Sequence, residues 1–189
     1  PMAGRTDAWI VAQMAALHGR ACDAACLRRF HDAYVPRLAR EVHEPGPRKG
    51  VLPGVRHLLD TLASRNDAYL ALLTGNFRSG AEIKLRHFGL WDYFGAGAFG
   101  DASMDRNALF EMALASVAEA GGPDVAPSDV VVIGDTPFDV AVAVAGGARS
   151  IGVATGGHAA SELHGSGATV VLEDLSDVAA VLRALDLDS

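Results

Sequence analysis

The chain has 189 residues, of which 50% are hydrophobic and only 6% are aromatic. This length suffices for one domain of ordinary size with a small insertion. The net charge is -7 and the only lysines are Lys49 and Lys84, which argues against nucleic acid as a partner because phosphate contacts need clustered basic residues. No apolar run approaches the roughly 20 residues of a membrane-spanning helix, so we expect no membrane partner either.

Cys22 and Cys26 are the only cysteines. Their spacing of four within a helical pattern predicts two half-buried thiols on one helix face, in preference to a disulfide or a metal-binding pair. Free thiols are typical of a reducing compartment, and we therefore expect a cytoplasmic protein.

The N-terminal part of the chain predicts two helices and no strand. Thr6 or Asp7 can cap a first helix that ends at Gly19, and a second helix is expected over residues 23–42. The expected inward-facing positions are Ile10, Met14 and Leu17 in the first helix and Leu27, Phe30, Tyr34 and Leu38 in the second. Residues 1–43 therefore resemble a helical insertion.

A linker over 43–54, with three prolines and three glycines, separates these helices from the rest of the chain. Helices and strands then alternate. We expect helices at about 55–62, 79–88, 107–120, from 138 onward and at 176–184, and strands at 69–73, 94–99, 130–133, 150–154 and 169–172. Strict alternation indicates an α/β fold with a doubly wound parallel sheet.

Polar residues stand at the ends of two of these strands. The first strand delivers Thr74, Gly75 and Asn76, whose hydroxyl and backbone N–H groups could bind phosphoryl oxygens. The alternative is an ordinary turn in which Asn76 caps the next helix. The polar turn after a later strand, residues 154–157, is expected to be a structural loop at the same rim.

An acid pair follows the apolar strand at 130–133. Asp135 lies at the strand end, Thr136 can cap the next helix, and Asp139 falls in its first turn, an arrangement suited to a divalent cation. The alternative is a capped helix with incidental acids. Arg106, just before the preceding helix, could offset the charge of an anion, or could form only a solvated pair with its neighbour Asp105.

Taken together, these residues resemble the haloacid-dehalogenase-like (HAD) superfamily. Leu72-Leu73-Thr74-Gly75-Asn76 is similar to its second motif, Arg106 to its third, and Gly134-Asp135-Thr136-Pro137-Phe138-Asp139 to its GDxxxD motif. Leu52-Pro53-Gly54-Val55 and Gly4-Arg5-Thr6-Asp7 resemble the phosphoglycolate-phosphatase-like branch, in which a helical cap follows the first strand.

The resemblance implies a Rossmann-like core over residues 44–189 and a small helical cap over 1–43, incomplete at its start. It also implies Mg²⁺-dependent hydrolysis of a small phosphorylated metabolite through an aspartyl-phosphate. The implied catalytic residues are Thr74, Arg106, Asp135 and Asp139. The implied substrate-binding residues are Thr74, Gly75, Asn76 and Arg106, and the implied metal ligands are Asp135 and Asp139.

One motif of the superfamily has no counterpart in this sequence. The first motif, DxD at the end of an apolar strand, supplies the nucleophile, and Asp186-Leu187-Asp188-Ser189 shares its letters without such a strand. We expect that the chain begins after that strand, which would lie between the strands ending at Thr74 and Asp135. Because strands lie about 4.8 Å apart, its absence would leave a gap of about 10 Å.

The chain as given is accordingly expected to be inactive, and its parent protein active. Two alternatives stay open, a phosphomutase of the same fold and a phosphate- or metal-binding protein without turnover. A true haloacid dehalogenase is disfavoured, because that reaction uses no metal and does not need an acid pair. The oligomeric state cannot be read from the sequence.

Overall fold

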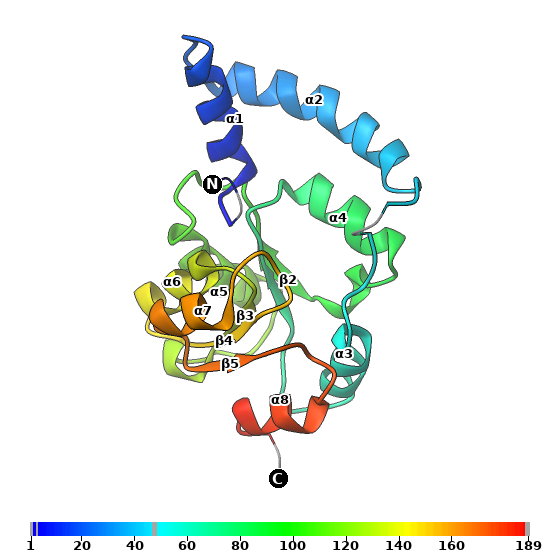
Figure 1. The fold of residues 1–189 in the computed structure, drawn as a ribbon, viewed down its shortest axis with the longest axis vertical. Coiled ribbons are helices and arrows are strands. Elements are labelled where there is room, and N and C mark those ends of the chain that lie inside the picture. Colours follow the sequence, from blue (N-terminus) through cyan, green and yellow to red (C-terminus); the bar gives the residue numbers. More distant parts are fainter. Residues whose placement is uncertain (1, 3, 47–48, 188–189) are drawn as a thin grey trace.

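The computed structural model describes residues 2, 4–46 and 49–187, so Asp188 and Ser189 of the C-terminal DLDS segment lie outside the described residues. It is an α/β structure of parallel strands flanked by helices (Figure 1). The helices are α1 (Asp7–Leu17), α2 (Ala24–Glu41), α3 (Val55–Ala63), α4 (Arg78–His87), α5 (Ala108–Glu119), α6 (Pro137–Gly146), α7 (Ala160–Gly165) and α8 (Val178–Ala184). The strands are β1 (Ala71–Leu73), β2 (Ala96–Ala98), β3 (Val131–Gly134), β4 (Arg149–Val153) and β5 (Val170–Leu172).

The strands form two parallel sheets rather than one. β1 pairs with β2, and β4 lies between β3 and β5 in the second sheet. Among the described strands, none pairs with both β1 and β3. The sheet is therefore broken at the position where the sequence predicts a gap, and the α/β fold class with parallel strands is confirmed.

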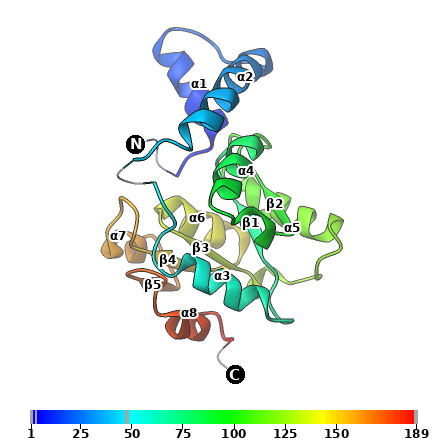
Figure 2. The same cartoon turned by 90° about the vertical axis from the view of Figure 1, so that its right-hand side faces the viewer.

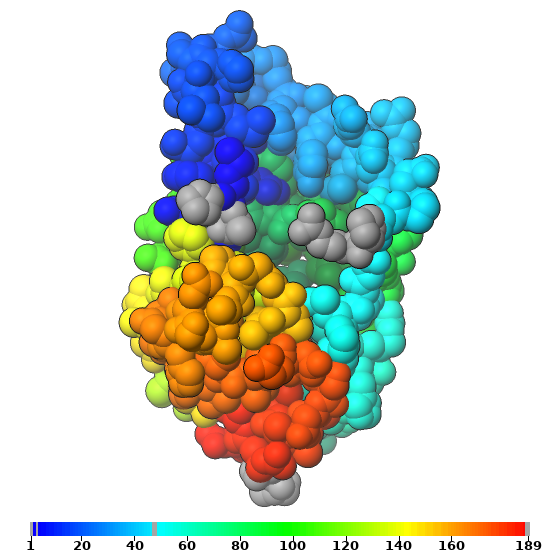
Figure 3. Space-filling view, in the orientation of Figure 1, coloured from blue at the N-terminus to red at the C-terminus, as the bar shows by residue number. Residues whose placement is uncertain are grey.

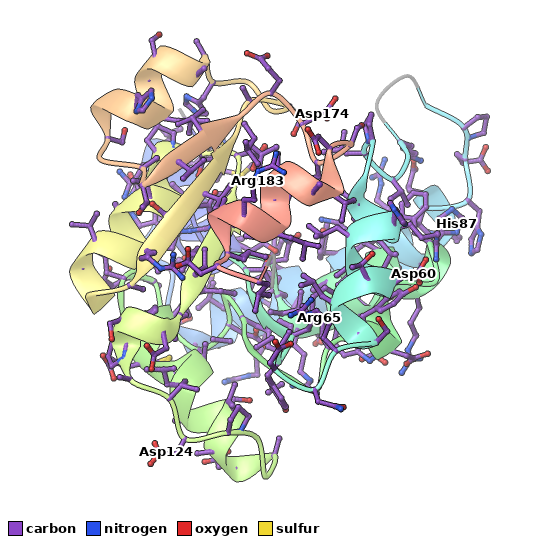
Figure 4. The ribbon with its side chains drawn as sticks, turned by 90° about the horizontal axis from the view of Figure 1, so that it is seen from below. Asp60, Arg65, His87, Asp124, Asp174 and Arg183 are labelled. Atoms are coloured by element: carbon purple, nitrogen blue, oxygen red, sulfur yellow. A yellow bond between two sulfur atoms is a disulfide. The ribbon has the colours of Figure 1, made fainter. Side chains whose placement is uncertain are left out.

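Helices cover both faces of the β3–β4–β5 sheet. Val132 packs with Phe110, Val142 and Ala143 beneath α5 and α6. Its neighbours Val131 and Ile133 point to the opposite face, as strand geometry requires, and pack against the cluster formed by α3 and α8. Figure 4 shows α8 lying beside α3 on that face. This two-sided covering is the doubly wound arrangement that the alternating sequence predicts.

The helices α1 and α2, here called the helical pair, lie at the end of the molecule opposite the C-terminus (Figures 2 and 3). Thr6 caps α1 by accepting a hydrogen bond from the Trp9 N–H, as predicted. The predicted inward face of α1 is wrong, since Met14 is 46% exposed and Leu17 is 80% exposed. Because α1 is apolar on several sides, periodicity does not select its buried face, which is formed by Ala8 and Val11.

In α2, which lies within the predicted range 23–42, Asp23 caps the helix, and the helix continues through Pro36. Leu27 and Tyr34 pack near Phe77 of the core, but Phe30 is exposed rather than inward-facing. No residue of α2 is fully buried. No helix in the part of the chain that the structure describes is long and apolar enough to cross a membrane.

The two cysteines form a disulfide, so the prediction of two free thiols is wrong. Cys22 lies before α2, outside the helix, whereas Cys26 lies in its first turn. The chain direction changes between them, and this brings their Cα atoms to 5.2 Å, within the range that a disulfide spans. The cytoplasmic location remains a prediction, and free thiols no longer support it.

Candidate active site

Residues from three separate parts of the chain meet beside the carboxyl ends of β1 and β3. Thr74 follows β1, Asp135 follows β3, and Arg106 lies in the segment before α5. Arg106 connects the other two, because its Nη1 lies 2.8 Å from the position that a Cβ on Gly75 would take, while its Nη2 donates to Asp139. The structure thus brings together the turn, the guanidinium and the acid pair.

Hydrogen bonds within the Thr74–Asn76 turn fix the role of the Thr74 hydroxyl. Its oxygen accepts from the Asn76 backbone N–H at 3.2 Å and from the Asn76 side-chain amide at 3.0 Å. With both lone pairs used, the hydroxyl hydrogen remains free to donate outward. The interpretation of Asn76 as a helix cap is wrong, since Phe77 is the N-cap of α4 and the Arg78 N–H at the helix start donates to the Asp101 carboxylate.

Gly75 permits the close packing of this turn against the segment before α1. A Cβ at this position would lie 2.5 Å from the backbone oxygen of Arg5, which leaves no room for a side chain. The Gly75 carbonyl in turn accepts a hydrogen bond from the Asp7 N–H at 2.7 Å. The turn is therefore held against the start of the helical pair.

Asp139 uses its carboxylate to organise the acid loop. Its Oδ2 accepts from the Thr136 N–H at 3.0 Å and from the Thr136 hydroxyl at 2.8 Å, and the Thr136 oxygen accepts from the Asp139 N–H, which completes a capping box. Its Oδ1 accepts from Arg106. Both oxygens are engaged and buried, so in this arrangement Asp139 positions Arg106 and the loop and does not present a free ligand.

The Arg106 guanidinium is buried together with its partner, with 12% of the Arg106 side chain exposed against 10% for Asp139. The alternative of a solvated pair with Asp105 is wrong, because Asp105 accepts from the Asn107 N–H instead. Arg106 Nε is buried and has no partner among the described residues. A guanidinium with donors to spare at this rim is suited to bind an anion.

Asp135 is the acid whose charge is less well compensated. Burial raises the pKa of its carboxyl, and the negative charge of Asp139 raises it further, while its own backbone N–H, His158 and Arg106 lower it to a smaller extent. The 154–157 turn lines the same rim, because a Cβ on Gly156 would lie 2.1 Å from Asp135 Oδ2. A half-buried carboxylate repelled by a second acid gains from a nearby cation.

Of the two acids at the rim, Asp135 is the one suited to bind Mg²⁺. Among the described residues, no group of three or more acids, histidines or cysteines is arranged to hold a metal ion. Mg²⁺, however, is commonly bound by one or two carboxylates together with water and phosphate oxygens. Asp135 fits such a shared site, whereas Asp139 would have to release Arg106 or Thr136 to become a direct ligand.

Sequence reasoning missed one charged contact at this site. Lys84, on α4, donates to Asn76 Oδ1. The sequence pattern placed Lys84 within a helix but gave no sign of where its side chain leads. No sequence signal could have revealed this contact, because Asn76 precedes α4 and helical spacing does not relate the two residues.

Comparison with known proteins agrees with this geometry. Residues 106–178 match the family model described as HAD-hydrolase-like. A relative from Dickeya dadantii (strain 3937), named "Probable phosphatase IndB", is 30% identical over 135 residues, which cover 71% of this chain and 57% of that protein. The chain thus spans a little more than half the length of this relative.

Solved structures show the same fold. A hydrolase from Pseudomonas syringae has a TM-score of 0.72 and 23% identity, covering 97% of this chain and 80% of its own. A protein from Bacteroides vulgatus, provisionally named beta-phosphoglucomutase, has a TM-score of 0.68 and 20% identity, covering 96% of this chain and 71% of its own. Parallel strands with an arginine and an acid pair at the rim are thus arranged in the α/β fold that these proteins share. The chain is HAD-like in sequence and in fold.

Proposed function

We propose that the protein to which this chain belongs is a Mg²⁺-dependent phosphatase that hydrolyses a small phosphomonoester. The observation that carries the proposal is the position of Arg106, which lies against the Gly75 turn and pairs with Asp139. A free hydroxyl donor and a guanidinium with spare donors then face one rim. This combination can bind a phosphoryl group and stabilise the charge on its oxygens.

Each residue has a role in this proposal. Thr74 and the backbone N–H of Gly75 bind phosphoryl oxygens, and Arg106 neutralises their charge. The Asn76 N–H, predicted to bind phosphate too, is already donated to the Thr74 oxygen. Asp139 holds Arg106 in place through the buried ion pair. Asp135 would ligate Mg²⁺, which when bound would further neutralise the phosphoryl oxygens.

The nucleophile is the aspartate that the family resemblance implies, carried on a strand between β1 and β3. The break between the two sheets supports this part of the proposal, because β1 and β3 each pair with a strand on one side only. An aspartate at the end of such a strand would reach the same rim and form the aspartyl-phosphate. Without it, the chain binds phosphate but does not turn substrate over.

The helical pair acts as the cap in this proposal. Phe77, the residue after Asn76, packs against Ala8 and Val11 of α1, so the helical pair is seated directly beside the phosphoryl turn. Arg5 stacks on the rings of Trp9 and Phe138, 4.7 and 4.2 Å from the ring centroids, and thereby joins α1 to the acid loop. A cap in this position would exclude water and select the leaving group.

The test is an assay of the full-length protein with p-nitrophenyl phosphate and Mg²⁺. We expect hydrolysis that Asp135→Asn abolishes and that Asp129→Asn, an exposed acid before β3, leaves unchanged. Transfer between sugar phosphates without net hydrolysis would instead support a phosphomutase, the function named for the Bacteroides vulgatus protein. Phosphate binding without turnover in the full-length protein would contradict the proposal and support a binding protein.

A further inference from the structure

Lys84 occupies an unusual position for a lysine on a helix at the surface of the core. Its neighbours Glu82 and Arg86 on α4 form an exposed i,i+4 ion pair, whereas Lys84 is half-buried and directs its ammonium to Asn76. Burial lowers the pKa of Lys84, and the nearby charge of Asp7 offsets this only in part. The chain therefore buries a cation at some cost beside the phosphoryl turn.

The contact with Lys84 determines which way the Asn76 amide faces. An ammonium is a donor only, so it must meet Oδ1, and Nδ2 is then directed to Thr74 Oγ1. If the amide were reversed, its oxygen would face the Thr74 oxygen, and the Thr74 hydroxyl would donate to Asn76 instead of outward. The orientation of one amide thus decides whether the Thr74 proton is available to a ligand.

The hydrogen-bonded residues Lys84, Asn76 and Thr74 are also linked to the helical pair. Asp7, the first residue of α1, accepts a hydrogen bond from the Phe77 N–H at 2.8 Å, and its negative charge acts on Lys84 to raise the pKa of the ammonium. The burial that raises the pKa of Asp7 is offset by this N–H and by Lys84. Asp7 and Lys84 therefore each bond one of the two residues that follow Gly75, Asp7 at Phe77 and Lys84 at Asn76.

We infer that Lys84 is a positioning residue of the phosphoryl site, which orients the Asn76 amide so that the Thr74 hydroxyl donates to the phosphoryl group. The inference rests on the proposed function, because it assigns the partner of the Thr74 proton. A purely structural role for Lys84 would stabilise α4 without changing anion affinity. A direct role as a second cation would act on the anion independently of Thr74.

The experiment is isothermal titration of inorganic phosphate, in the presence of Mg²⁺, into the full chain and its Lys84→Met variant. Methionine keeps the apolar stem and removes the ammonium. We expect affinity to fall about tenfold, the loss of one oriented hydrogen bond to an anion. Arg86→Met, which removes a cation from the exposed side of the same helix, should leave affinity unchanged.

The Lys84→Met substitution is also made in a Thr74→Val variant, which lacks the Thr74 hydroxyl. If Lys84 acts through Asn76 and Thr74, then Lys84→Met should have no further effect on phosphate affinity in Thr74→Val. An equal tenfold loss in that background would overturn the inference in favour of a direct cation. Unchanged affinity in Lys84→Met alone would also overturn it.

Stability measurements keep these outcomes separable. Because a buried charge is removed, Lys84→Met should unfold in urea at the same concentration as the parent chain or a higher one. If it fails to fold, Lys84→Gln, whose amide can still donate to Asn76, should restore both folding and phosphate affinity, and folding without affinity would overturn the inference. Failure of the parent chain itself to bind phosphate would contradict the proposed function rather than the role of Lys84.

Discussion

At the scale of single residues, the Arg106–Asp139 pair is the most strongly determined part of the site. Both side chains are buried, and Asp139 also bonds Thr136 twice. Removing one member of a buried ion pair leaves an uncompensated charge, which costs far more than the pair itself contributes. The pair therefore serves to hold Arg106 in place more than to add stability.

We predict that Asp139→Asn lowers the free energy of unfolding by about 3–5 kcal/mol, measured by urea denaturation. The matched control is Asp186→Asn, which breaks the exposed pair with Arg149 and should cost much less. Equal losses in the two variants would contradict the buried character of the Arg106–Asp139 pair.

Asp7 gives a prediction of pH dependence. Its folded-state pKa is raised above 3.8, chiefly by burial, so the folded chain binds more protons than the unfolded chain between pH 3.8 and the raised value. Stability contributed by this group therefore falls as the pH rises through that window, and the charged carboxylate costs stability at neutral pH. Asn at position 7 keeps an oxygen for the Phe77 N–H and removes the charge.

We therefore expect Asp7→Asn to melt at a higher temperature than the parent chain at pH 7, with the difference vanishing below about pH 3.8. Thermal unfolding followed by circular dichroism at several pH values measures this. A difference that grows toward low pH would have the wrong sign and would refute the assignment.

Sequence reasoning located the site residues that follow a strand or begin a helix, because Thr74, Asp135 and Thr136 carry local signals. It could not place Lys84 or Asp7. These two residues lie 77 positions apart, and only the packing of α1 against Phe77 brings them together. It predicted Asp139 as a metal ligand, with a helix capped by Thr136 and incidental acids as the alternative. The structure uses the Asp139 carboxylate in the capping box and in the ion pair with Arg106.

At the scale of elements, the helices and strands of the core lie close to their predicted ranges, since caps and glycines mark their ends. Gly89, with φ +65°, follows the end of α4, and the Leu90 N–H donates to the Leu85 carbonyl. No helix is predicted at α7, because it spans only six residues and follows a glycine-rich turn. Short helices depend on packing, here of Leu163 against Val140.

The buried faces of the helical pair differ most from those predicted. Its inner face is small, which leaves a hollow of about 490 Å³ between α1 and α2, lined by Val11, Met14 and Phe30 among others. None of the predicted site residues lines this hollow. The helical spacing of apolar residues could not reveal the hollow, because it indicates which faces of α1 and α2 are apolar and not which faces are covered by other residues.

The disulfide gives a prediction for this element. The loop that it closes is short, so replacing both cysteines by serine should lower stability by at most about 2 kcal/mol. Thiol titration of the unfolded, non-reduced chain should find no free thiol, and reduction should release two. Two free thiols before reduction would restore the original expectation from the sequence.

At the scale of the whole molecule, the break between β1 and β3 is the main structural feature. β4 is paired on both sides, whereas β1 and β3 are each paired on one side only. Unpaired backbone groups in an otherwise apolar setting are costly, and strands at open edges are the first to exchange with solvent. The break is thus expected to be the least stable part of the core.

We predict that amides of β1 and β3 exchange with deuterium faster than those of β4, as followed by mass spectrometry of the native chain. The strands β3 and β4 belong to the same sheet, and β4 is paired on both sides and more buried, which makes β4 the slow-exchanging reference. Equally slow exchange in all three strands would show that another segment pairs with β1 and β3.

The central claim is that one small anion can contact Thr74 and Arg106 while a metal ion on Asp135 shares it. An experimental structure of the chain soaked with inorganic phosphate and Mg²⁺ tests this most directly. The account predicts phosphate within hydrogen-bonding distance of the Thr74 hydroxyl and the Arg106 guanidinium, with Mg²⁺ on the Asp135 carboxylate. Phosphate bound elsewhere, or Thr74 and Asp135 too far apart to share one anion, would contradict it.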